Sequence, residues 1–401
     1  MEGEVLNNKN LDTTKKENVV NYFFFENGIA LSTEPKEYWA PFVDGIKKEL
    51  KTNYIIKYCS CNSLKSKTSD GIEVGALRLA NEICNDLKDT KSKRGDEKYK
   101  IHFIGHSLGG LYFRLAIPIL FNRNIFNNPN YIPFSFITLE SPHAGVKKSQ
   151  TGIKSFFGNV FEGETLNELE LNDRPFPPYD PSCLDEYPLL LRMVEDDVIA
   201  PLKKFKHLTL VQNIRASPQV PYVSSALDRA IPYDRDFLQD QFLLDGFNFL
   251  RGYNDIVDGC TKQYQLQNDH GDIFEERVDG CIIHDRIIKQ LNTLNWRRLN
   301  VHFRTKSNDA HIFIMGQMNR KKLFKNWGNE DVERYLDVIA KIIKRDIDIE
   351  NNTLETNPSL TEEVNNPIKS DDQPFKEEKL IDIPQSTQIV QQTDKDQTQL
   401  L

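Results

Sequence analysis

The segment Gly105-His106-Ser107-Leu108-Gly109 has the residue types and the Gly-x-Ser-x-Gly spacing of a nucleophilic serine on a sharp turn, and a further glycine follows it. An apolar run ends at Ile104 before it, and the apolar run Leu111–Ile117 comes after it. In such a strand–turn–helix the serine hydroxyl is exposed at the carboxyl end of the strand, and bulky side chains do not fit two residues before and after it. This segment, called the elbow below, therefore predicts that Ser107 attacks a carbonyl carbon. A glycine-rich turn that only packs a helix against a strand is the alternative interpretation.

Attack on a carbonyl forms an oxyanion, which needs hydrogen-bond donors next to the serine. The backbone N–H of Leu108, directly after Ser107, is one such donor. A second donor is expected from the loop after an early strand. Asn27-Gly28-Ile29-Ala30 follows the strand candidate Tyr22–Phe25, so we expect this loop to lie beside the elbow.

Several segments make the chain similar to the serine esterases of the lipase-like α/β-hydrolase group, the DUF676 type. The Ser-Pro-His-x-Gly pattern is more particular to this group than the elbow, which many hydrolases share. The resemblance covers most of the chain between residues 19 and 345. The segments that carry it are the Asn27-Gly28 loop, Thr68-Ser-Asp-Gly-Ile-Glu-Val-Gly-Ala-Leu-Arg-Leu-Ala80, the elbow, Ser141-Pro-His-Ala-Gly-Val146, and a weaker match from His284 through Trp296 to Asp309-Ala310-His311.

The resemblance implies an α/β-hydrolase fold and the hydrolysis of esters, often of lipids, with no metal and no organic cofactor. It implies that Ser107 is the nucleophile and that the N–H groups of Ile29 and Leu108 form the oxyanion hole. It also implies that His311 is the general base. Imidazole titrates near neutrality, so it can take the serine proton and return it to the leaving alcohol. Of the eight histidines, His284 at the start of a helical run is the alternative base.

The sequence departs from the family pattern at the triad acid. The family places this acid in an Asn-x-x-x-Asp-x-x-Val-Pro frame, and residues 213–221 keep the frame with Ser217 at the position of the acid. A hydroxyl can hold one imidazole tautomer but cannot stabilise imidazolium by charge. Loss of the triad carboxylate costs about 10⁴-fold in turnover in well-studied serine hydrolases. Asn27 is a second departure, since the family usually has histidine there.

Glu140 is the candidate that could replace the missing acid. It stands at the carboxyl end of the strand after the elbow, directly before the Ser-Pro-His pattern. We therefore offer the hypothesis that Glu140 orients His311. A solvated Glu140, or one paired to a lysine such as Lys147, is the alternative, and Asp228 and Asp234 are fallback acids.

Short apolar runs alternate with stretches of helical period, which predicts an α/β fold with a mostly parallel sheet and helices on both faces. The strand candidates are Val19–Phe25, Tyr54–Tyr58, Lys100–Gly105, Phe134–Leu139, His207–Ile214 and Arg298–Phe303. The helix candidates are Glu37–Lys51, Gly71–Leu87, a helix from Leu108, and Val332–Ile343.

We expect a polar N-terminal extension over residues 1–18, an α/β-hydrolase domain over 19–345 and a disordered acidic tail over 346–401. Residues 346–401 contain 13 acidic and 4 basic side chains and a single aromatic, so they account for the whole net charge of −8. Such a segment buries too little apolar surface to offset its ordering entropy. Two long stretches, at about 146–197 and 234–280, interrupt the alternation. We expect them to be lid-like insertions, with functionless helical decoration as the alternative.

Composition limits the classes of partner and location. The part before residue 346 is nearly neutral and has no basic stripe interleaved with aromatics, so nucleic acid is not an expected partner. No run of about 18 apolar residues is present, which argues against a spanning helix. With no secretory signal and only six cysteines, we expect a cytoplasmic protein with reduced thiols. The lid-like insertions could contact a membrane peripherally. The oligomeric state cannot be predicted.

The expected function is therefore that of a serine esterase or lipase-like hydrolase, which cleaves carboxylic esters, of lipids above all, through an acyl-enzyme on Ser107. A transferase reaction, with another alcohol in place of water, stays open. The alternative from another class is a weak or silent hydrolase fold that binds a lipid or protein partner, which Ser217 favours and the intact elbow opposes.

Overall fold

The structure is a computed structural model of the chain. By its contacts the molecule divides into residues 1–350 and 351–401, and the sheet with its covering helices belongs to the first unit. The described residues are 19–29, 34–95, 97–146, 163–174, 187–215, 217, 219–228, 243–247, 282–304, 310–317 and 327–356.

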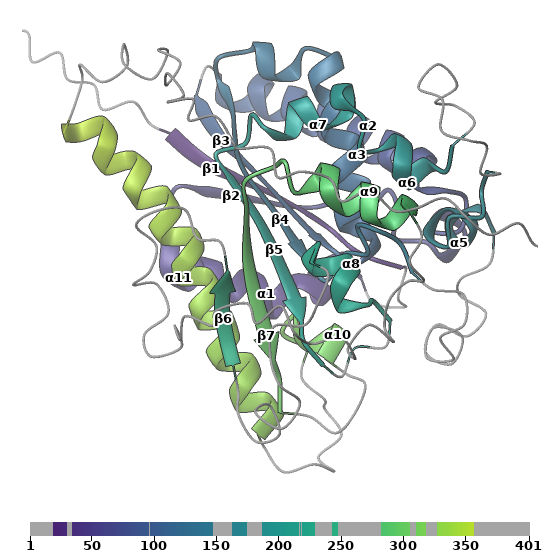
Figure 1. The fold of residues 1–401 in the computed structure, drawn as a ribbon. Helices are drawn as coiled ribbons and strands as arrows, with labels where there is room; N and C mark the ends of the chain where they lie inside the picture. Colours follow the sequence, from purple (N-terminus) through teal and green to yellow (C-terminus); the bar gives the residue numbers. More distant parts are fainter. Residues whose placement is uncertain are drawn as a thin grey trace, which may run out of the picture. The chain divides into compact units, whose positions relative to one another are not determined.

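A seven-stranded sheet forms the centre of the first unit (Figure 1). Its order is β2-β1-β3-β4-β5-β7-β6, with β6 antiparallel to β7 and every other neighbouring pair parallel. The strands are β1 (Val19–Glu26), β2 (Tyr54–Tyr58), β3 (Lys98–His106), β4 (Tyr131–Leu139), β5 (His207–Asn213), β6 (Leu243–Phe247) and β7 (Trp296–His302). The predicted α/β fold with a mostly parallel sheet is confirmed.

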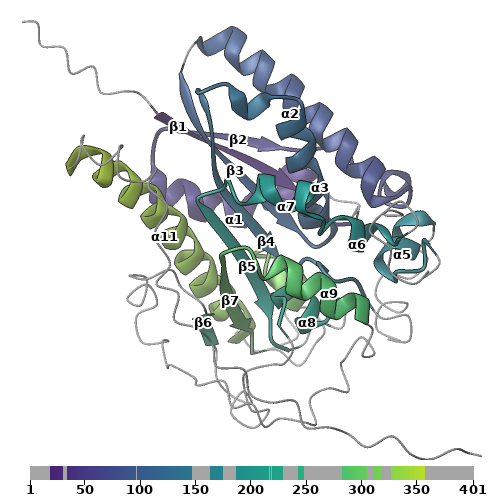
Figure 2. The same ribbon diagram turned by 45° about the horizontal axis from the view of Figure 1, so that its top comes forward.

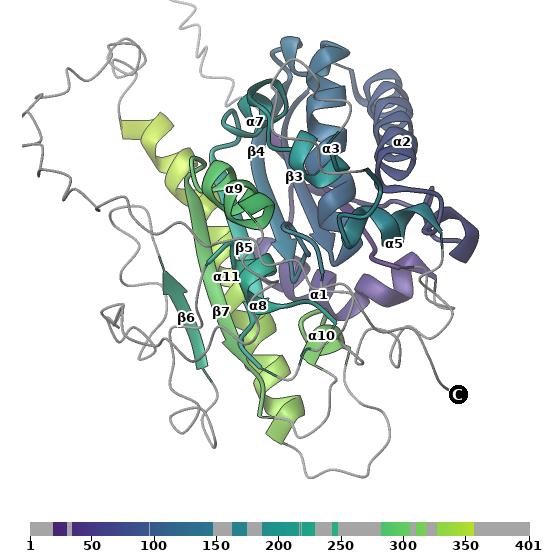
Figure 3. The same cartoon turned by 45° about the vertical axis from the view of Figure 1, so that its right-hand side comes forward.

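Helices cover both faces of the sheet (Figures 1 and 3). One face packs against α1 (Pro35–Leu50), α10 (Ala310–Phe313) and α11 (Trp327–Thr356). The opposite face packs against α2 (Ile72–Arg94), α3 (Leu108–Asn122), α5 (Glu164–Leu169), α6 (Leu189–Arg192), α7 (Asp196–Leu202) and α9 (Ile282–Leu291). The short helix α8 (Tyr222–Ala226) comes after β5.

The aromatic run of β1 explains why this strand lies inside the sheet. Successive strand residues point to opposite faces, so Tyr22 and Phe24 join the core under α2 and α3, while Phe23 and Phe25 join the core under α1 and α11. All four side chains are buried. A parallel strand covered on both faces reads as a continuous apolar run, and this run is what the sequence shows.

The order of the strands reverses its direction between β1 and β3. After β1 the chain passes through α1 to β2, and α2 then brings it back across β1 to β3. The helices that follow the two strands, α1 and α3, therefore lie on opposite faces. In open α/β sheets ligands bind in the crevice that opens at such a reversal of strand order. The loop after β1 and the elbow after β3 both begin there.

Parts of the two predicted insertions lie in the described ranges. Within 146–197, α5 packs at the start of α2, as Figure 2 shows: the Gly71 N–H donates to Thr165 Oγ1 at 2.9 Å and the Ile72 N–H to Glu168 Oε2 at 2.5 Å. Side chains of α5 thereby satisfy N–H groups that a helix start leaves without partners. Within 234–280, β6 extends the sheet beside β7, which would otherwise present an open edge. The other residues of the second insertion lie outside the described residues, and a lid role for both segments stays a prediction.

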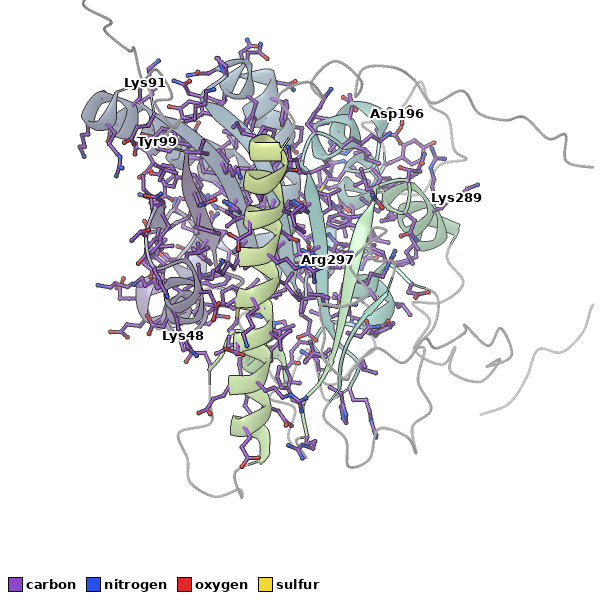
Figure 4. All side chains as sticks on the ribbon, turned by 90° about the vertical axis from the view of Figure 1, so that its left-hand side faces the viewer. Lys48, Lys91, Tyr99, Asp196, Lys289 and Arg297 are labelled. Atoms are coloured by element: carbon purple, nitrogen blue, oxygen red, sulfur yellow. The ribbon has the colours of Figure 1, made fainter. Side chains whose placement is uncertain are left out.

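The helix α11 continues past the domain end predicted at Arg345 and corrects it. Asp346 is 2% exposed and accepts hydrogen bonds from both terminal nitrogens of Arg297, at 3.0 and 2.6 Å. Figure 4 shows Arg297 on the sheet beside this helix. Ile347 is also buried. Residues 346–356 are therefore helical because charge pairing and apolar burial order their first turn, and the remainder of the predicted tail lies outside the described residues.

Among the described residues no helix combines the length and the apolar character needed to cross a membrane.

We expect Asp346→Ala to lower the free energy of unfolding by about 3–5 kcal/mol, because the charge of the buried Arg297 guanidinium would lose the Asp346 carboxylate that compensates it. Asp337→Ala is the matched control: Asp337 forms an exposed pair with Lys341 on the same helix, so its loss should cost less than about 1 kcal/mol. Urea denaturation measures both. Equal, small losses would show that the buried pair does not order the end of the domain.

Candidate active site

The elbow holds Ser107 in a strained conformation between β3 and α3. Ser107 has φ 53° and ψ −123°, a region that non-glycine residues occupy only when the surrounding structure imposes it. Here the end of β1 packs directly on the first turn of α3: a Cβ on Gly109 would lie 2.4 Å from the Glu26 carbonyl oxygen. The elbow thus needs glycine at this position, as the sequence pattern predicts. The Leu108 N–H begins α3 and has no carbonyl partner within the helix.

The loop after β1 lies against the serine. A Cβ on Gly28 would stand 2.8 Å from Ser107 Cβ and 3.3 Å from Ser107 Oγ. Asn27 is buried, and its Oδ1 accepts a hydrogen bond from Trp39 Nε1 on α1 at 2.6 Å. Asparagine in place of the usual histidine is therefore anchored to α1. Gly28 therefore lets the main chain of the loop after β1 approach Ser107 closely.

The structure brings Glu140 and His311 together from positions 171 residues apart. His311 Nδ1 lies 3.0 Å from Glu140 Oε2, and both side chains are buried. Glu140 follows β4 directly, with φ 50°, and its N–H donates to the Val211 carbonyl at 2.7 Å. A carboxylate accepts only, so the proton of this bond sits on Nδ1 and the imidazole lone pair on Nε2. Such an arrangement holds one tautomer and stabilises imidazolium by charge.

Asn213 joins the acid to the segment that carries the histidine. Its Nδ2 donates to Glu140 Oε2 and, at 3.0 Å, to the carbonyl oxygen of Ala310. Asn213 ends β5 and is 3% exposed, so both bonds are shielded from water. In the sequence this residue stands out only as the start of the family frame. Its retention beside a missing acid was the signal that could have identified it.

Ser217, at the family's acid position, bonds locally: its Oγ donates to Gln219 Oε1 at 3.2 Å. Of the fallback acids, Asp228 faces Arg298, whose pKa is lowered by burial and partly restored by this carboxylate. Asp234 lies outside the described residues. The alternative base His284 lies on α9.

His106 holds the main chain of His311 by a hydrogen bond, a role that the sequence did not indicate. Its Nε2 lies 3.0 Å from the carbonyl oxygen of His311 and its Nδ1 2.7 Å from the Tyr38 hydroxyl. A carbonyl can only accept, so Nε2 carries the proton and Tyr38 donates to Nδ1. Burial holds the pKa of His106 well below its ordinary value. A neutral His106 therefore fixes the main chain of α10, which Figure 1 shows at the carboxyl ends of β5 and β7.

Within the described ranges no group of three His, Cys, Asp or Glu side chains is arranged to hold a metal ion. The chemistry that the arrangement itself offers is acyl transfer: a strained serine, backbone donors beside it, and a histidine–carboxylate pair at the same edge of the sheet.

The chain is similar to a family profile and to proteins that are described as esterases or lipases. The family profile described as "Putative serine esterase (DUF676)" matches residues 27–227. Two proteins of Saccharomyces cerevisiae are similar: "Putative lipase YDL109C" is 33% identical over 40% of this chain and 23% of its own length, and "Triacylglycerol lipase 2" is 29% identical over 35% of this chain and 36% of its own length. The chain thus matches about a quarter to a third of the length of these curated relatives. Carboxyl esterase 2 from the fungus Tuber melanosporum aligns over 82% of this chain and 78% of its own, with 11% identity and a TM-score of 0.41.

The family match contains the loop from Asn27, the elbow, Glu140 and the frame with Ser217, whereas His311 lies beyond its end. The same sheet edge carries all of these segments in the α/β-hydrolase fold described above. Because the profile covers half of the 401 residues, the chain belongs to the DUF676 serine esterase family.

Proposed function

We propose that the protein is a serine hydrolase that cleaves carboxylic esters, with lipid acyl esters as the substrate class, through an acyl-enzyme on Ser107. The observation that carries the proposal is the buried Glu140–His311 bond at the sheet edge where the strained Ser107 stands. Membership of the serine esterase family supports the reaction class. The names of the two yeast relatives, both called lipases, support lipid esters as substrates.

In the acylation step, Ser107 Oγ attacks the ester carbonyl carbon while Nε2 of His311 takes the hydroxyl proton. The negative charge that develops on the carbonyl oxygen is met by the N–H groups of Ile29 and Leu108. When the tetrahedral intermediate collapses, the alcohol leaves with the proton from His311. In deacylation water attacks the carbonyl carbon of the acyl-enzyme, and His311 accepts a proton from this water. When the second intermediate collapses, His311 gives this proton to Ser107 Oγ and the carboxylic acid is released.

Glu140 serves as the triad acid in this proposal, in place of the residue missing at position 217. Its carboxylate would face the imidazolium formed in each step, and the buried setting strengthens that attraction because water screens it little. The Asn213 amide supplies a second hydrogen bond to the same oxygen. A carboxylate so held stays oriented toward Nδ1 throughout the cycle.

A silent hydrolase fold that binds a lipid or a protein partner is the second candidate, favoured by Ser217. It requires that no carboxylate reaches the histidine. The 3.0 Å distance between Glu140 and His311 argues against it, so we rank it below hydrolysis.

We expect a fluorophosphonate probe to label the purified protein and to leave Ser107→Ala unlabelled, because only a serine activated by a base reacts with the probe. Hydrolysis of a short-chain p-nitrophenyl ester should disappear with the label. Ser135→Ala serves as the control, since Ser135 is a buried serine of β4 that bonds His102. A folded protein that takes no label would support the binding alternative.

We expect Glu140→Gln to lower kcat by about 10²–10⁴-fold, because a side-chain amide can offer an N–H to Nδ1 and favour the wrong imidazole tautomer. Ser217→Ala should change kcat less than about twofold, since in this proposal Ser217 touches neither the base nor the substrate. Steady-state kinetics at one pH compare both with the wild type. A loss below tenfold for Glu140→Gln would remove Glu140 from the triad.

We expect Gly28→Ala to abolish probe labelling, because the added Cβ would stand 2.8 Å from Ser107 Cβ. It would displace the loop Asn27–Ile29, called the oxyanion loop below because the proposed mechanism gives it the Ile29 donor. Gly45→Ala is the matched control: its Cβ would meet the nearest atom at 3.4 Å, an ordinary contact, and alanine favours the helix. Normal labelling of a Gly28→Ala protein would show that this loop does not line the site.

A further inference from the structure

A buried carboxyl group lies on the side of the oxyanion loop that faces α2. Glu26 ends β1, immediately before Asn27 and Gly28, and is 1% exposed. Its backbone carbonyl packs on the elbow at Gly109, as described above. The position of Glu26 therefore fixes where the oxyanion loop begins. The reaction proposed above gives the Glu26 side chain no task.

Asn62, in the connection from β2 to α2, holds the Glu26 side chain. Its Nδ2 lies 3.3 Å from Glu26 Oε1 and 3.1 Å from the carbonyl oxygen of Gly75. Its Oδ1 accepts a hydrogen bond from Arg78 Nε at 2.9 Å. Asn62 is itself 1% exposed, so this link between the end of β1 and α2 is shielded from solvent.

Arg78 in turn is fixed by a bidentate pair. Its two terminal nitrogens donate to Asp70 at 2.6 and 2.8 Å, and one of them also donates to the Lys67 carbonyl at 2.5 Å. The planar guanidinium thus presents Nε to Asn62 in one orientation, which a lysine could not do. Asp70, Gly75 and Arg78 all lie in the Thr68–Ala80 segment, which carries the family resemblance but supplies no group to the reaction.

We propose that Arg78 and Asn62 are positioning residues that hold Glu26, and with it the Ile29 N–H, in the place where the oxyanion forms. The inference rests on the proposed function. Oxyanion donors act only when they are fixed close to their ideal position. Here Trp39 anchors Asn27 from the α1 side and Asn62 anchors Glu26 from the α2 side, so the loop is held from both faces of the sheet.

The protonation of Glu26 gives this role a signature of its own. Burial, together with the Glu82 carboxylate, raises its pKa to about 8, while the Asn62 bond and the Arg78 charge lower it. Burial raises the pKa values of the thiols and the phenol around it, so these stay neutral. The groups that face Glu26 are Glu82 and Arg78 of α2, Cys59 and Cys61 at and after the end of β2, and Tyr112 of α3.

The sign follows from the raised pKa. The folded protein binds the Glu26 proton more tightly than the unfolded chain does, so stability from this group falls as pH rises from the ordinary carboxyl pKa toward about 8. Above that value the side chain is a buried anion, and the start of the oxyanion loop is disturbed. Activity should therefore decline on the alkaline side with a midpoint near 8.

The experiment measures kcat, KM and the pH profile for hydrolysis of a short-chain p-nitrophenyl ester by the full chain. Asn62→Ala and Arg78→Met should lower kcat about 10–100-fold with KM changed less than about twofold, since a displaced donor is lost mainly in the transition state. Arg78→Lys should fall between Arg78→Met and the wild type. Asn62→Ala and Arg78→Met should also move the alkaline decline in activity to higher pH, because each substitution removes a group that lowers the Glu26 pKa.

Glu26→Gln keeps the acceptor for Asn62 without the titration, so it should retain kcat near pH 7 and lose the alkaline decline. Arg94→Lys is the matched control: Arg94 pairs with Glu97 at the exposed far end of the same helix and should change neither parameter. A wild type without Ser107-dependent hydrolysis would overturn both proposals. An active wild type whose kcat and pH profile survive in Asn62→Ala, Arg78→Met and Glu26→Gln would overturn this one alone.

Should Asn62→Ala fail to fold, Arg78→Lys and Glu26→Gln decide the question, because both keep polar groups of similar size in place. If kcat falls only in variants whose melting temperature also falls, and the alkaline decline stays at the same pH, the network only stabilises the fold. The positioning role would then be wrong.

Discussion

The close approach of the β1 and β3 strand ends is the constraint on which the site depends. The Glu26 carbonyl sits where a side chain at position 109 would have to go, and Gly28 sits where a side chain would strike Ser107. Because positions 109 and 28 carry no side chain, the main chain of the loop after β1 can lie directly against the serine. The reversal of strand order sends the following helices to opposite faces, and ligands of open α/β sheets bind at such a reversal.

In the proposed mechanism the triad acid comes from the end of β4 and not from the loop after β5, where the family frame places it. The carboxyl ends of β4 and β5 are neighbours, with Glu140 bonded through its N–H to Val211 of β5. A carboxylate that leaves the loop after β5 can therefore be replaced from the end of β4, provided that the backbone turns the side chain inward. The φ of 50° at Glu140 does this. Asn213, at the end of β5, bonds Glu140, so in the proposed mechanism a residue of the family frame supports the acid.

Much of this could be predicted from the sequence, and the failures have physical causes. Burial restricts β1 to apolar residues and the tight turn restricts the elbow to glycine, so the strands and the turn at Ser107 could be predicted from the local sequence. Pairing across 171 residues was readable only as a hypothesis for Glu140 and His311. The supporting roles of three residues could not be predicted, because a buried asparagine or histidine has the same local sequence pattern whether it supports a site or merely packs. These residues are Asn213, His106 and Asn62. The end of α11 escaped because Asp346 reads as one more acid of an acidic segment until Arg297 is seen beside it.

The imidazole rings of His106 and His311 lie next to each other, so the charge that each can carry depends on the other. The rings of His106 and His311 are 4.6 Å apart between centroids, and in the proposed reaction only His311 may become positive. Two adjacent cations would oppose each other strongly in a buried site. Burial lowers the pKa of His106, and the Tyr38 hydroxyl with the His311 carbonyl satisfies its neutral form. His311 instead faces a carboxylate. In the proposed reaction the two histidines therefore have separate tasks: His106 holds the backbone as a neutral donor, and His311 carries the proton.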